Sequence, residues 1–432
     1  MQRFLRETRS FLLLWSSQAL SSLGSAMTSF ALIIWVYQQE GTATSVALLS
    51  FFTYLPSILF CFVAGTLADG WNKKRIMLVC DAAAAAGTVA VWALHGAGAL
   101  RVWHLYAVNL LISFMNAFQG PASYVAVSLL TPKAHYARAC GLQTFSGALV
   151  SVLTPALAAA VLAFGGLETV LTLDLATFAA AFLVLLFCIR LPGESKAESK
   201  VKESFWKSCT AGLRFLREHA SLLHMILFFA LINLLAYMTG FGILPAMVLA
   251  RTGDNQAALG AVSSAMGLGS LAGSVLATLG KPSKRRARVI FACCGVSFLC
   301  CDVVWALGRV PWIWVCGAFA GSLPLPFLNV NLTTIMRTRV PLPMQGRVFS
   351  ARDTLQYCTI PVGLFLGGFL ADNLFEPFMA APSPLRDALA TLVGSGRGSG
   401  MAVIFLLTGI IGVTVNLWAL HQPSFRELDA EE

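Results

Sequence analysis

The stretch of sequence that decides the fold is Asp69-Gly70-Trp71-Asn72-Lys73-Lys74-Arg75, a charged loop between two long apolar segments. A helix of about 20 apolar residues is long enough to cross roughly 30 Å of membrane hydrocarbon. Three successive bases beside such a helix favour the cytoplasmic side of the membrane. The loop therefore predicts a membrane protein and also the orientation of its chain.

The amino-acid composition agrees with a chain that lies in a bilayer. Hydrophobic residues make up 57% of the sequence and charged residues 12%, with a mean hydropathy of +0.75. Soluble proteins carry about twice that share of charge, roughly a quarter of their residues. We therefore expect an all-α membrane protein with twelve transmembrane helices, at about residues 11–37, 45–68, 76–99, 102–128, 139–164, 168–190, 221–250, 257–280, 288–308, 311–336, 348–371 and 400–420.

Lysine and arginine are distributed unevenly over the connections between these segments. If both termini are cytoplasmic, 25 of the 30 bases lie in or near cytoplasmic segments. The five on the outer side are Arg101, Arg251, Arg309, Arg386 and Arg397. Because membrane proteins typically show this bias, we predict a multi-pass protein of the cell membrane with both termini in the cytoplasm. Topology then explains the net charge of +10, and no nucleic-acid partner is expected.

A polar segment near the middle of the chain separates two halves. Residues 194–200 alternate acids and bases, and the following residues place aromatic and aliphatic side chains among bases, as in a helix that lies on a membrane surface. Pro132 precedes Arg138 by the same spacing as Pro341 precedes Arg347, which indicates an internal repeat. We therefore predict two pseudo-symmetric six-helix bundles, at residues 1–190 and 221–432, joined by a cytoplasmic linker with an amphipathic segment at 191–220.

The charged loop from Asp69 to Arg75, with the residues before it, also resembles a known motif. The run from Gly65 to Lys74, GTLADGWNKK, is similar to the loop 2-3 signature of the major facilitator superfamily. Phe229–Asn233, Ile243–Pro245 and Gly267–Gly269 resemble the seventh and eighth spans of the branch that contains macrolide efflux proteins and the enterobactin exporter. The resemblance implies the major facilitator fold and transport by alternating access.

The chain departs from the family pattern at several positions. Gly70 stands where a base is usual, Asn72 stands where glycine is usual, and Ile112 occupies a position where span four often carries arginine. In the second half, Ala277 replaces the aspartate of the loop motif. These departures weaken the case for proton coupling more than the case for transport.

Asp69 is expected to act on a helix other than its own. A carboxylate at the end of a helix faces the negative end of that helix dipole, whereas the N-terminus of another helix attracts it. By resemblance that other helix is span eleven, and the contact would close an inner gate. The expected gate residues are Gly65, Asp69, Lys73, Lys74, Arg75, Arg352 and Asp353. The alternative for the three bases is that they bind anionic lipid and set the topology.

Three acidic residues fall inside predicted spans: Asp81, Asp174 and Asp302. A charge at such depth is costly and usually functional, so each carboxyl is expected to be neutral or paired. They are the candidates for coupling transport to protons. The alternative is a purely structural hydrogen bond between helices, because the resemblance makes spans three, six and nine supporting helices.

The expected substrate cavity is lined by uncharged polar groups among aromatic residues and methionine. Its candidate residues, from predicted spans one, four, seven and ten, are Gln18, Ser21, Ser25, Asn116, Gln119, Asn233, Tyr237 and Asn329. Such a lining suits a bulky amphipathic solute. Many of these groups could instead join helices to one another.

The sequence predicts no enzyme, cofactor or metal site. The glycine-rich run Gly394–Gly400 lies in an expected outer loop without the strand and helix of a phosphate-binding loop, and the cysteines are expected to pack as small apolar residues. We expect a monomer in contact with lipid that exports drug-like or siderophore-like amphipathic compounds by proton antiport. The alternatives are an uptake permease, an uncoupled facilitator, or a membrane sensor or scaffold without transport activity.

Overall fold

The computed structural model describes residues 8–69, 72–132, 136–189, 205–279, 285–341 and 345–430. Within these ranges the regular secondary structure is helical. The chain divides into two units, one made of Met1–Gly41 with Leu48–Ser199 and the other of Thr42–Ala47 with Lys200–Glu432. The all-α prediction is confirmed for the described residues, and the linker segment 191–204 lies outside them.

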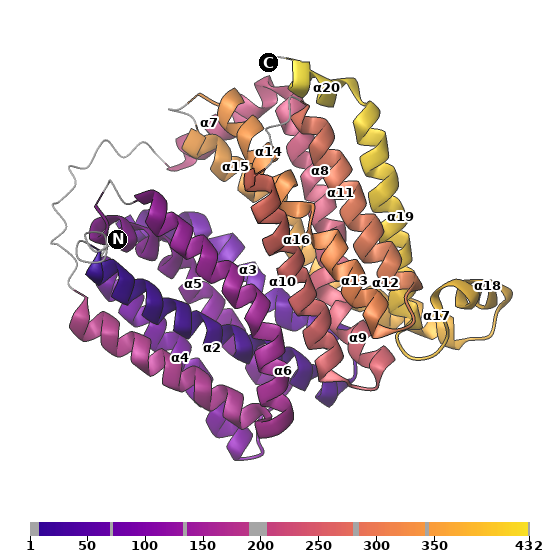
Figure 1. Ribbon diagram of the computed structural model, residues 1–432, viewed down its shortest axis with the longest axis horizontal. Helices are drawn as coiled ribbons and strands as arrows, with labels where there is room; N and C mark the ends of the chain where they lie inside the picture. The colour runs from indigo at the N-terminus through magenta and orange to yellow at the C-terminus, as the bar shows by residue number, and fades with distance from the viewer. Residues whose placement is uncertain are drawn as a thin grey trace. The chain divides into compact units, whose positions relative to one another are not determined.

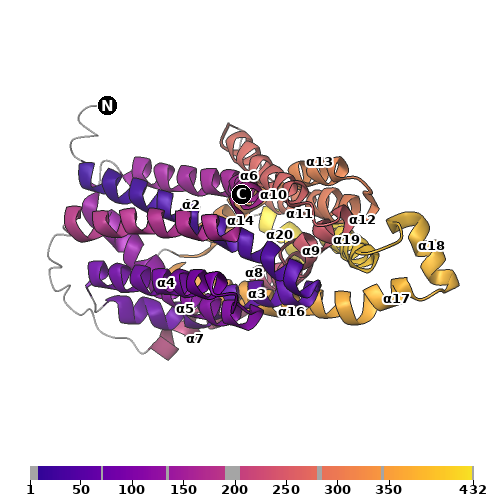
Figure 2. The same cartoon turned by 90° about the horizontal axis from the view of Figure 1, so that it is seen from below.

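The helices of the first unit are α2 (Arg9–Glu40), α3 (Ala43–Asp69), α4 (Lys73–Gly96), α5 (Val102–Leu130), α6 (Tyr136–Leu183) and the π-helix η2 (Val184–Cys188). Within this unit α2 packs along α6, and α4 packs against both α5 and α6. Figure 2 shows α2, α4, α5 and α6 running side by side along one direction. A buried apolar cluster that includes Leu14, Met77 and Leu185 holds α2, α4 and η2 together.

Local signals in the sequence set the ends of these helices. Gly41 has a φ of 67° and closes α2, where its N–H donates to the carbonyl of Tyr37. Asn72 caps α4 by accepting the N–H of Arg75 at 3.1 Å. The asparagine that stands in place of the family's usual glycine thus has a structural role of its own.

The helix α6 contains a reversal of backbone conformation at Gly166, where φ is 69° and ψ is −177°. Side chains with a Cβ atom are essentially excluded from this conformation, so glycine is required. The predicted spans 139–164 and 168–190 meet at this kink.

Ten helical stretches among the described residues are long and apolar enough to cross a membrane. The longest of them, Leu142–Cys188, includes the kink at Gly166 and covers both of the spans predicted there. The span predicted at 102–128 coincides with α5, which is not one of the ten. The prediction of a multi-pass membrane protein is therefore confirmed, and the count of twelve spans stays a prediction.

The second unit contains more and shorter helices. They are α7 (Phe205–Glu218), α8 (Ala220–Ala236), η3 (Tyr237–Ile243), α9 (Leu244–Thr252), α10 (Gln256–Leu279), α11 (Arg286–Phe298), η4 (Leu299–Val303), α12 (Val304–Leu307), α13 (Pro311–Ser322), α14 (Leu325–Arg339), α15 (Gln345–Tyr357), α16 (Thr359–Leu370), η6 (Ala371–Phe375), α17 (Glu376–Ala380), α18 (Pro384–Val393), α19 (Ser399–His421) and α20 (Pro423–Ala430). Figure 1 shows α8, α11 and α19 side by side, with α20 at one end of α19 and α17 and α18 at the other.

An apolar core with several aromatic rings joins the helices of the second unit. The rings of Phe228, Phe291 and Phe425 contact one another, and they bring α8, α11 and α20 together. The start of α3 also belongs to this unit, because the carboxylate of Asp372 accepts the N–H groups of Ala43 at 3.1 Å and Thr44 at 2.6 Å. An acidic group at a helix N-terminus satisfies donors that the helix itself leaves unbonded.

Several long helices of the second unit pass through a π-helical turn. The turn η3 follows α8, η4 follows α11, and η6 follows α16. A π-turn inserts an extra residue into a helix, and it occurs frequently at functional sites. Two of these turns, η3 and η4, carry the polar residues described below.

We predict that Gly166→Ala will destabilise the protein by about 1–3 kcal/mol, because alanine is strained in the backbone conformation at this kink. The matched control is Gly120→Ala in α5, where an added Cβ would meet no atom within 4 Å. Thermal unfolding of the purified protein in detergent measures both effects. Equal unfolding midpoints for the two variants would contradict the requirement for glycine at the kink.

Candidate functional site

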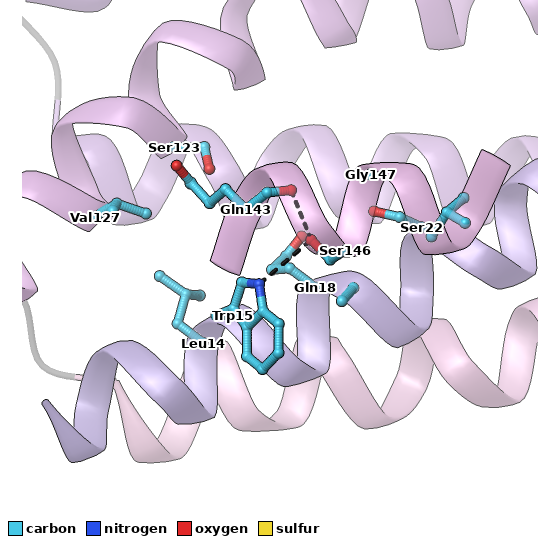
Figure 3. A pocket seen from close by; sticks show the side chains of 11 residues that line it. Leu14, Trp15, Gln18, Ser22, Ser123, Val127, Gln143, Ser146 and Gly147 are labelled. Carbon is cyan, nitrogen blue, oxygen red and sulfur yellow. Dashed lines mark hydrogen bonds between the residues drawn. The ribbon is translucent and has the colours of Figure 1, made fainter. Parts of the chain in front are cut away.

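A cavity of about 210 Å³ lies within the first unit, between α2, α5 and α6. Figure 3 shows it with Trp15 and Gln18 of α2 facing Ser146 of α6. Its walls are formed by Leu14, Trp15, Gln18, Ala19, Ser22, Ser123, Val127, Gln143, Ser146, Gly147 and Val150. The lining combines an indole ring and aliphatic groups with hydroxyl and amide groups, as in pockets for amphipathic ligands.

The indole of Trp15 is fixed in the wall of this cavity. Its N–H donates to the carbonyl of Leu142 at 3.0 Å and lies 3.3 Å from the hydroxyl oxygen of Ser146. Because both partners belong to α6, the ring holds α2 against α6. An ordered aromatic wall is available to an apolar ligand without a loss of side-chain freedom on binding.

Gln18 connects the cavity to a buried carboxylate. Its side-chain amide nitrogen lies 3.4 Å from Oδ2 of Asp81, and the amide nitrogen of Gln119 lies 2.5 Å from Oδ1. Gln18 comes from α2, Asp81 from α4 and Gln119 from α5, so three helices meet at this carboxylate. Only Gln18 also lines the cavity.

A second carboxylate, Asp174 of α6, has hydroxyl donors. The hydroxyl of Ser25 donates to Oδ1 at 2.9 Å, and that of Thr88 donates to Oδ2 at 3.4 Å. Gly24 lies against this group, since a Cβ atom there would come within 3.2 Å of Oδ1. The close approach of α2 to α6 beside Asp174 therefore depends on glycine.

The third carboxylate, Asp302, lies in the π-turn η4 of the second unit. Its Oδ1 accepts the hydroxyl of Thr239 at 2.8 Å and that of Thr408 at 3.1 Å. Thr239 belongs to the π-turn η3 and Thr408 to α19, so this carboxylate also joins three helical segments.

These three carboxylates share an unusual environment. Asp81, Asp174 and Asp302 are 9%, 4% and 6% exposed, and their hydrogen-bond partners described above are neutral amides and hydroxyls. Where side chains are described, the ion pairs join Arg352 with Asp353 and Arg386 with Asp387, and neither involves the three acids. A buried carboxylate without a cation is costly to keep ionised, so each of these groups is suited to hold a proton.

The structure divides the expected cavity residues into different roles. Gln18 lines the cavity and contacts Asp81, Gln119 donates to Asp81, and Ser25 donates to Asp174. Asn233 donates to the carbonyl of Gln356 at 3.1 Å and so joins α8 to α15. The stacked ring of Tyr237 lies 4.6 Å from that of Phe241.

Three other candidates do not line the cavity that the structure shows. Asn116 and Asn329 are exposed, and Ser21 is partly buried. Their assignment to a substrate cavity stays a prediction. Ser22, another polar residue of predicted span one, does line the cavity, and the polar or aromatic residues that sequence reasoning missed are Trp15, Ser123, Gln143 and Ser146. The helical spacing of Trp15, Gln18 and Ser22 on α2 is the signal that could have indicated Trp15.

Parts of the expected inner gate are ordered by contacts within their own unit. The ammonium of Lys74 donates to the carbonyls of Leu186 at 2.9 Å and Ile189 at 2.7 Å, at the end of η2. A cation is favoured at such a C-terminal end. Lys73 is buried and Arg75 is exposed.

The remaining gate residues are described only in part. Arg352 and Asp353 form an ion pair with each other at 2.7 Å on α15, and the guanidinium lies 5.2 Å from the ring centre of Phe349. Gly65 and Asp69 belong to α3, but the contacts of their side chains lie outside the described structure. The latch by Asp69 therefore stays a proposal.

A polar network that the sequence did not indicate lies at the start of α19. The guanidinium of Arg251 donates to the carbonyls of Gly308 and Val393. The carboxylate of Glu376 accepts the N–H groups of Gly398 at 3.4 Å and Met401 at 3.1 Å. The contacts of Glu376 hold the connection that contains α17 and α18 against the N-terminus of α19.

Comparison with known proteins places the chain in a family. A family model described as the Major Facilitator Superfamily matches residues 14–364, which is most of the sequence. The chain belongs to the major facilitator superfamily. Members of this superfamily are transporters, so the prediction of a transporter rather than an enzyme is confirmed.

Similar members of the superfamily include proteins named for efflux. Macrolide efflux protein A of Streptococcus pyogenes is 24% identical over 369 residues, which cover 84% of this chain and 90% of that protein. The multidrug efflux pump Tap of Mycobacterium bovis is 25% identical over 432 residues, covering 97% of this chain and 94% of the pump. The predicted resemblance to the macrolide efflux branch is confirmed at this level of identity.

Solved structures of other facilitator proteins share the fold. A variant of the nucleoside transporter NupG matches with a TM-score of 0.72 at 12% identity, over 95% of this chain and 99% of its own. A bacterial homologue of the iron transporter ferroportin matches with a TM-score of 0.64 at 12% identity, over 96% of this chain and 99% of its own. At these identities the likeness concerns the fold alone.

We predict that Thr408→Val will destabilise the protein by about 1–3 kcal/mol, because the shape is kept while a buried carboxylate loses a donor. The matched control is Thr414→Val on the same helix, an exposed threonine whose hydroxyl donates to its own helix. Its effect should stay within about 0.5 kcal/mol. Denaturant unfolding in detergent micelles compares the two variants, and equal stabilities would show that the hydroxyl does not support Asp302.

Proposed function

We propose that this facilitator exports amphipathic organic compounds, with protons moving in the opposite direction, by alternating access. The observation that carries the proposal is the cavity between α2, α5 and α6, which shares Gln18 with a buried carboxylate. One side chain therefore adjoins a place for a ligand and a place for a proton. The names of the similar macrolide and multidrug efflux proteins support the outward direction.

The size and lining of the cavity favour part of a larger solute. Pockets for drug-sized ligands typically measure about 300–1000 Å³, whereas this cavity measures about 210 Å³. It would hold one ring or one substituent of a bulky compound against Trp15 and the serine hydroxyls. A compound that is both apolar and hydrogen-bonding fits this lining better than a small, highly charged one.

The three buried carboxylates support coupling to protons. Asp81, Asp174 and Asp302 each accept hydrogen bonds from neutral amides or hydroxyls, groups that can reorient to accept the O–H of a protonated acid. An intramembrane acid of this kind is a proton-relay candidate by default. In the absence of the arginine often found in span four, these acids are stronger coupling candidates than His104, which lies near the expected outer end of that span.

We predict that everted membrane vesicles containing the protein will accumulate a tritium-labelled macrolide when their interior is acidic. A gradient of about one pH unit is worth ~1.4 kcal/mol and supports at most about tenfold accumulation for one proton per substrate. Dissipating the gradient should release the label. Vesicles without the protein serve as the control, and siderophores and other amphipathic compounds complete the substrate panel.

Other outcomes of the vesicle assay identify the alternatives. Equilibration of the label without accumulation indicates an uncoupled facilitator, accumulation only under the opposite gradient indicates an uptake permease, and the absence of both for the whole panel indicates a sensor or scaffold. The variant in which Asp81, Asp174 and Asp302 are all changed to Asn should equilibrate substrate but not accumulate it. Full accumulation by this variant would exclude the carboxylates as coupling groups.

We also propose that Asp69 stabilises the closed inner gate through the N-terminus of a facing helix. A carboxylate at a helix N-terminus is worth ~0.3–1 kcal/mol, so we predict that Asp69→Asn shifts the ratio of open to closed states about two- to fivefold. Labelling of a cysteine introduced on the cytoplasmic side by an impermeant maleimide measures this ratio. Asp387→Asn, in an outer exposed ion pair, is the control, and unchanged labelling of the Asp69 variant would exclude the latch.

A further inference from the structure

Gln18 occupies a position between two chemical environments. Its side chain forms part of the cavity wall, and its amide nitrogen faces Oδ2 of Asp81. We propose that Gln18 is a positioning residue whose side-chain amide reverses when Asp81 takes up a proton. The cavity wall then presents the NH₂ group of Gln18 in place of its carbonyl oxygen, so that a ligand's N–H group loses its acceptor. This inference rests on the proposed transport function and specifies how proton and ligand are linked.

The hydrogen bonds of the ionised state fix the orientation of both amides. An ionised carboxylate only accepts hydrogen bonds, whereas a glutamine amide has an NH₂ donor group and a carbonyl acceptor. Gln18 and Gln119 both direct their nitrogen atoms toward Asp81. The carbonyl oxygen of Gln18 is then free of the carboxylate and available to a donor in the cavity.

A proton on Asp81 makes this arrangement unfavourable. The protonated carboxyl has an O–H group that needs an acceptor, but both neighbouring amides present donors. The Gln119 nitrogen lies at 2.5 Å and the Gln18 nitrogen at 3.4 Å, so the Gln18 contact is the weaker of the two. Gln18 also adjoins open volume in which an amide can turn. With the proton on Oδ2, Gln18 reverses, accepts the O–H at its carbonyl and presents its NH₂ group to the cavity.

Charged groups on α4, which carries Asp81, and on α6, which packs against α4, have hydrogen-bond partners of their own. On α4, the ammonium of Lys74 is bound to the carbonyls of Leu186 and Ile189. On α6, Asp174 accepts hydrogen bonds from Ser25 and Thr88. The thiol of Cys80 is the immediate chain neighbour.

The titratable residues of α2 and α5 lie toward the ends of those helices. On α2 they are Arg9 and Glu40, with Tyr37 close to the second, and on α5 they are His104 in the first turn, Tyr106 one turn later at most, and Tyr124 in the last two turns. Within the described structure the hydrogen bonds to the Asp81 carboxylate come from the two glutamines. A change in its protonation must therefore be met by one of these amides.

The chemistry of the cavity defines the class of ligand that would respond. Trp15, Val127 and Val150 offer an apolar lining, and serine hydroxyls can donate or accept. The Gln18 carbonyl supplies an acceptor only while Asp81 is ionised. The nearby negative charge also attracts a cation. The structure thus favours an amphipathic amine that inserts its ammonium-bearing group beside Gln18 and is released when Asp81 is protonated.

Infrared difference spectroscopy of the substrate-free protein tests the link between proton and amide. Wild-type protein in nanodiscs is compared between mildly alkaline and mildly acidic pH. We expect a protonated-carboxyl band that Asp81→Asn removes, together with a shifted glutamine carbonyl band that Gln18→Met removes. Gln119→Met, which lacks the other amide donor but leaves Gln18 in place, should keep the glutamine shift.

Ligand binding tests the consequence for the cavity. Tritium-labelled erythromycin, an amine-bearing macrolide, is the probe, and its dissociation constant is measured across the same pH range. The wild-type protein should bind about tenfold more tightly on the alkaline side, a difference of ~1.4 kcal/mol. Gln18→Met and Asp81→Asn should bind weakly with little pH dependence. Gln119→Met should keep the same ratio between the dissociation constants at acidic and alkaline pH, even if the pH at the midpoint of the change differs from that of the wild type.

The two measurements distinguish failure of this inference from failure of the proposed function. A glutamine band shift that persists in Gln18→Met, or a full pH dependence of binding in that variant, overturns the role of Gln18 while leaving transport intact. If Gln18→Met does not fold, Gln18→Leu replaces it. If the wild-type protein binds no macrolide at any pH, the proposed substrate is wrong, and the infrared comparison still decides whether Gln18 responds to the proton.

Discussion

The arrangement of this protein depends on the need to satisfy carboxylates that are buried without a cation. In a bundle of apolar helices, an acid that lacks a partner would be too costly to retain. Asp81, Asp174 and Asp302 are each satisfied by donors from other helical segments. Each acid therefore acts as a fixed point at which three helical segments meet.

This constraint explains several features that are otherwise unrelated. Gly24 lies where α2 approaches Asp174, since a side chain there would collide with the hydroxyl of Thr177 and crowd Asp174 itself. The π-turns η3 and η4 place Thr239 and Asp302 in contact. Neutral donors also tolerate both ionisation states of an acid better than a fixed cation would, because an arginine or lysine always favours the charged form. A group that must gain and lose a proton is best surrounded in this way.

Much of the site could be anticipated, but the roles of its residues could not. The position of each acid inside an apolar segment predicts Asp81, Asp174 and Asp302, and the polar side chains of the expected central spans predict Gln18, Gln119 and Ser25 as cavity residues. Which donor meets which acid depends on the rotation and register of neighbouring helices. The same limitation applies to Trp15, whose indole could have faced lipid and instead bonds to α6. Lys74, expected at a gate or at lipid, closes the end of η2.

The sequence by itself determined the membrane class, the family resemblance and the sidedness expected of the charged loops. These properties follow from local composition and from short motifs, because hydrophobic length and charge act through the solvent that surrounds each segment. Only the tertiary structure decided that one glutamine, Gln18, serves both a cavity and a carboxylate. Contacts of this kind join residues from separate helices or depend on side-chain geometry, and neither is encoded in the spacing of residues along the chain.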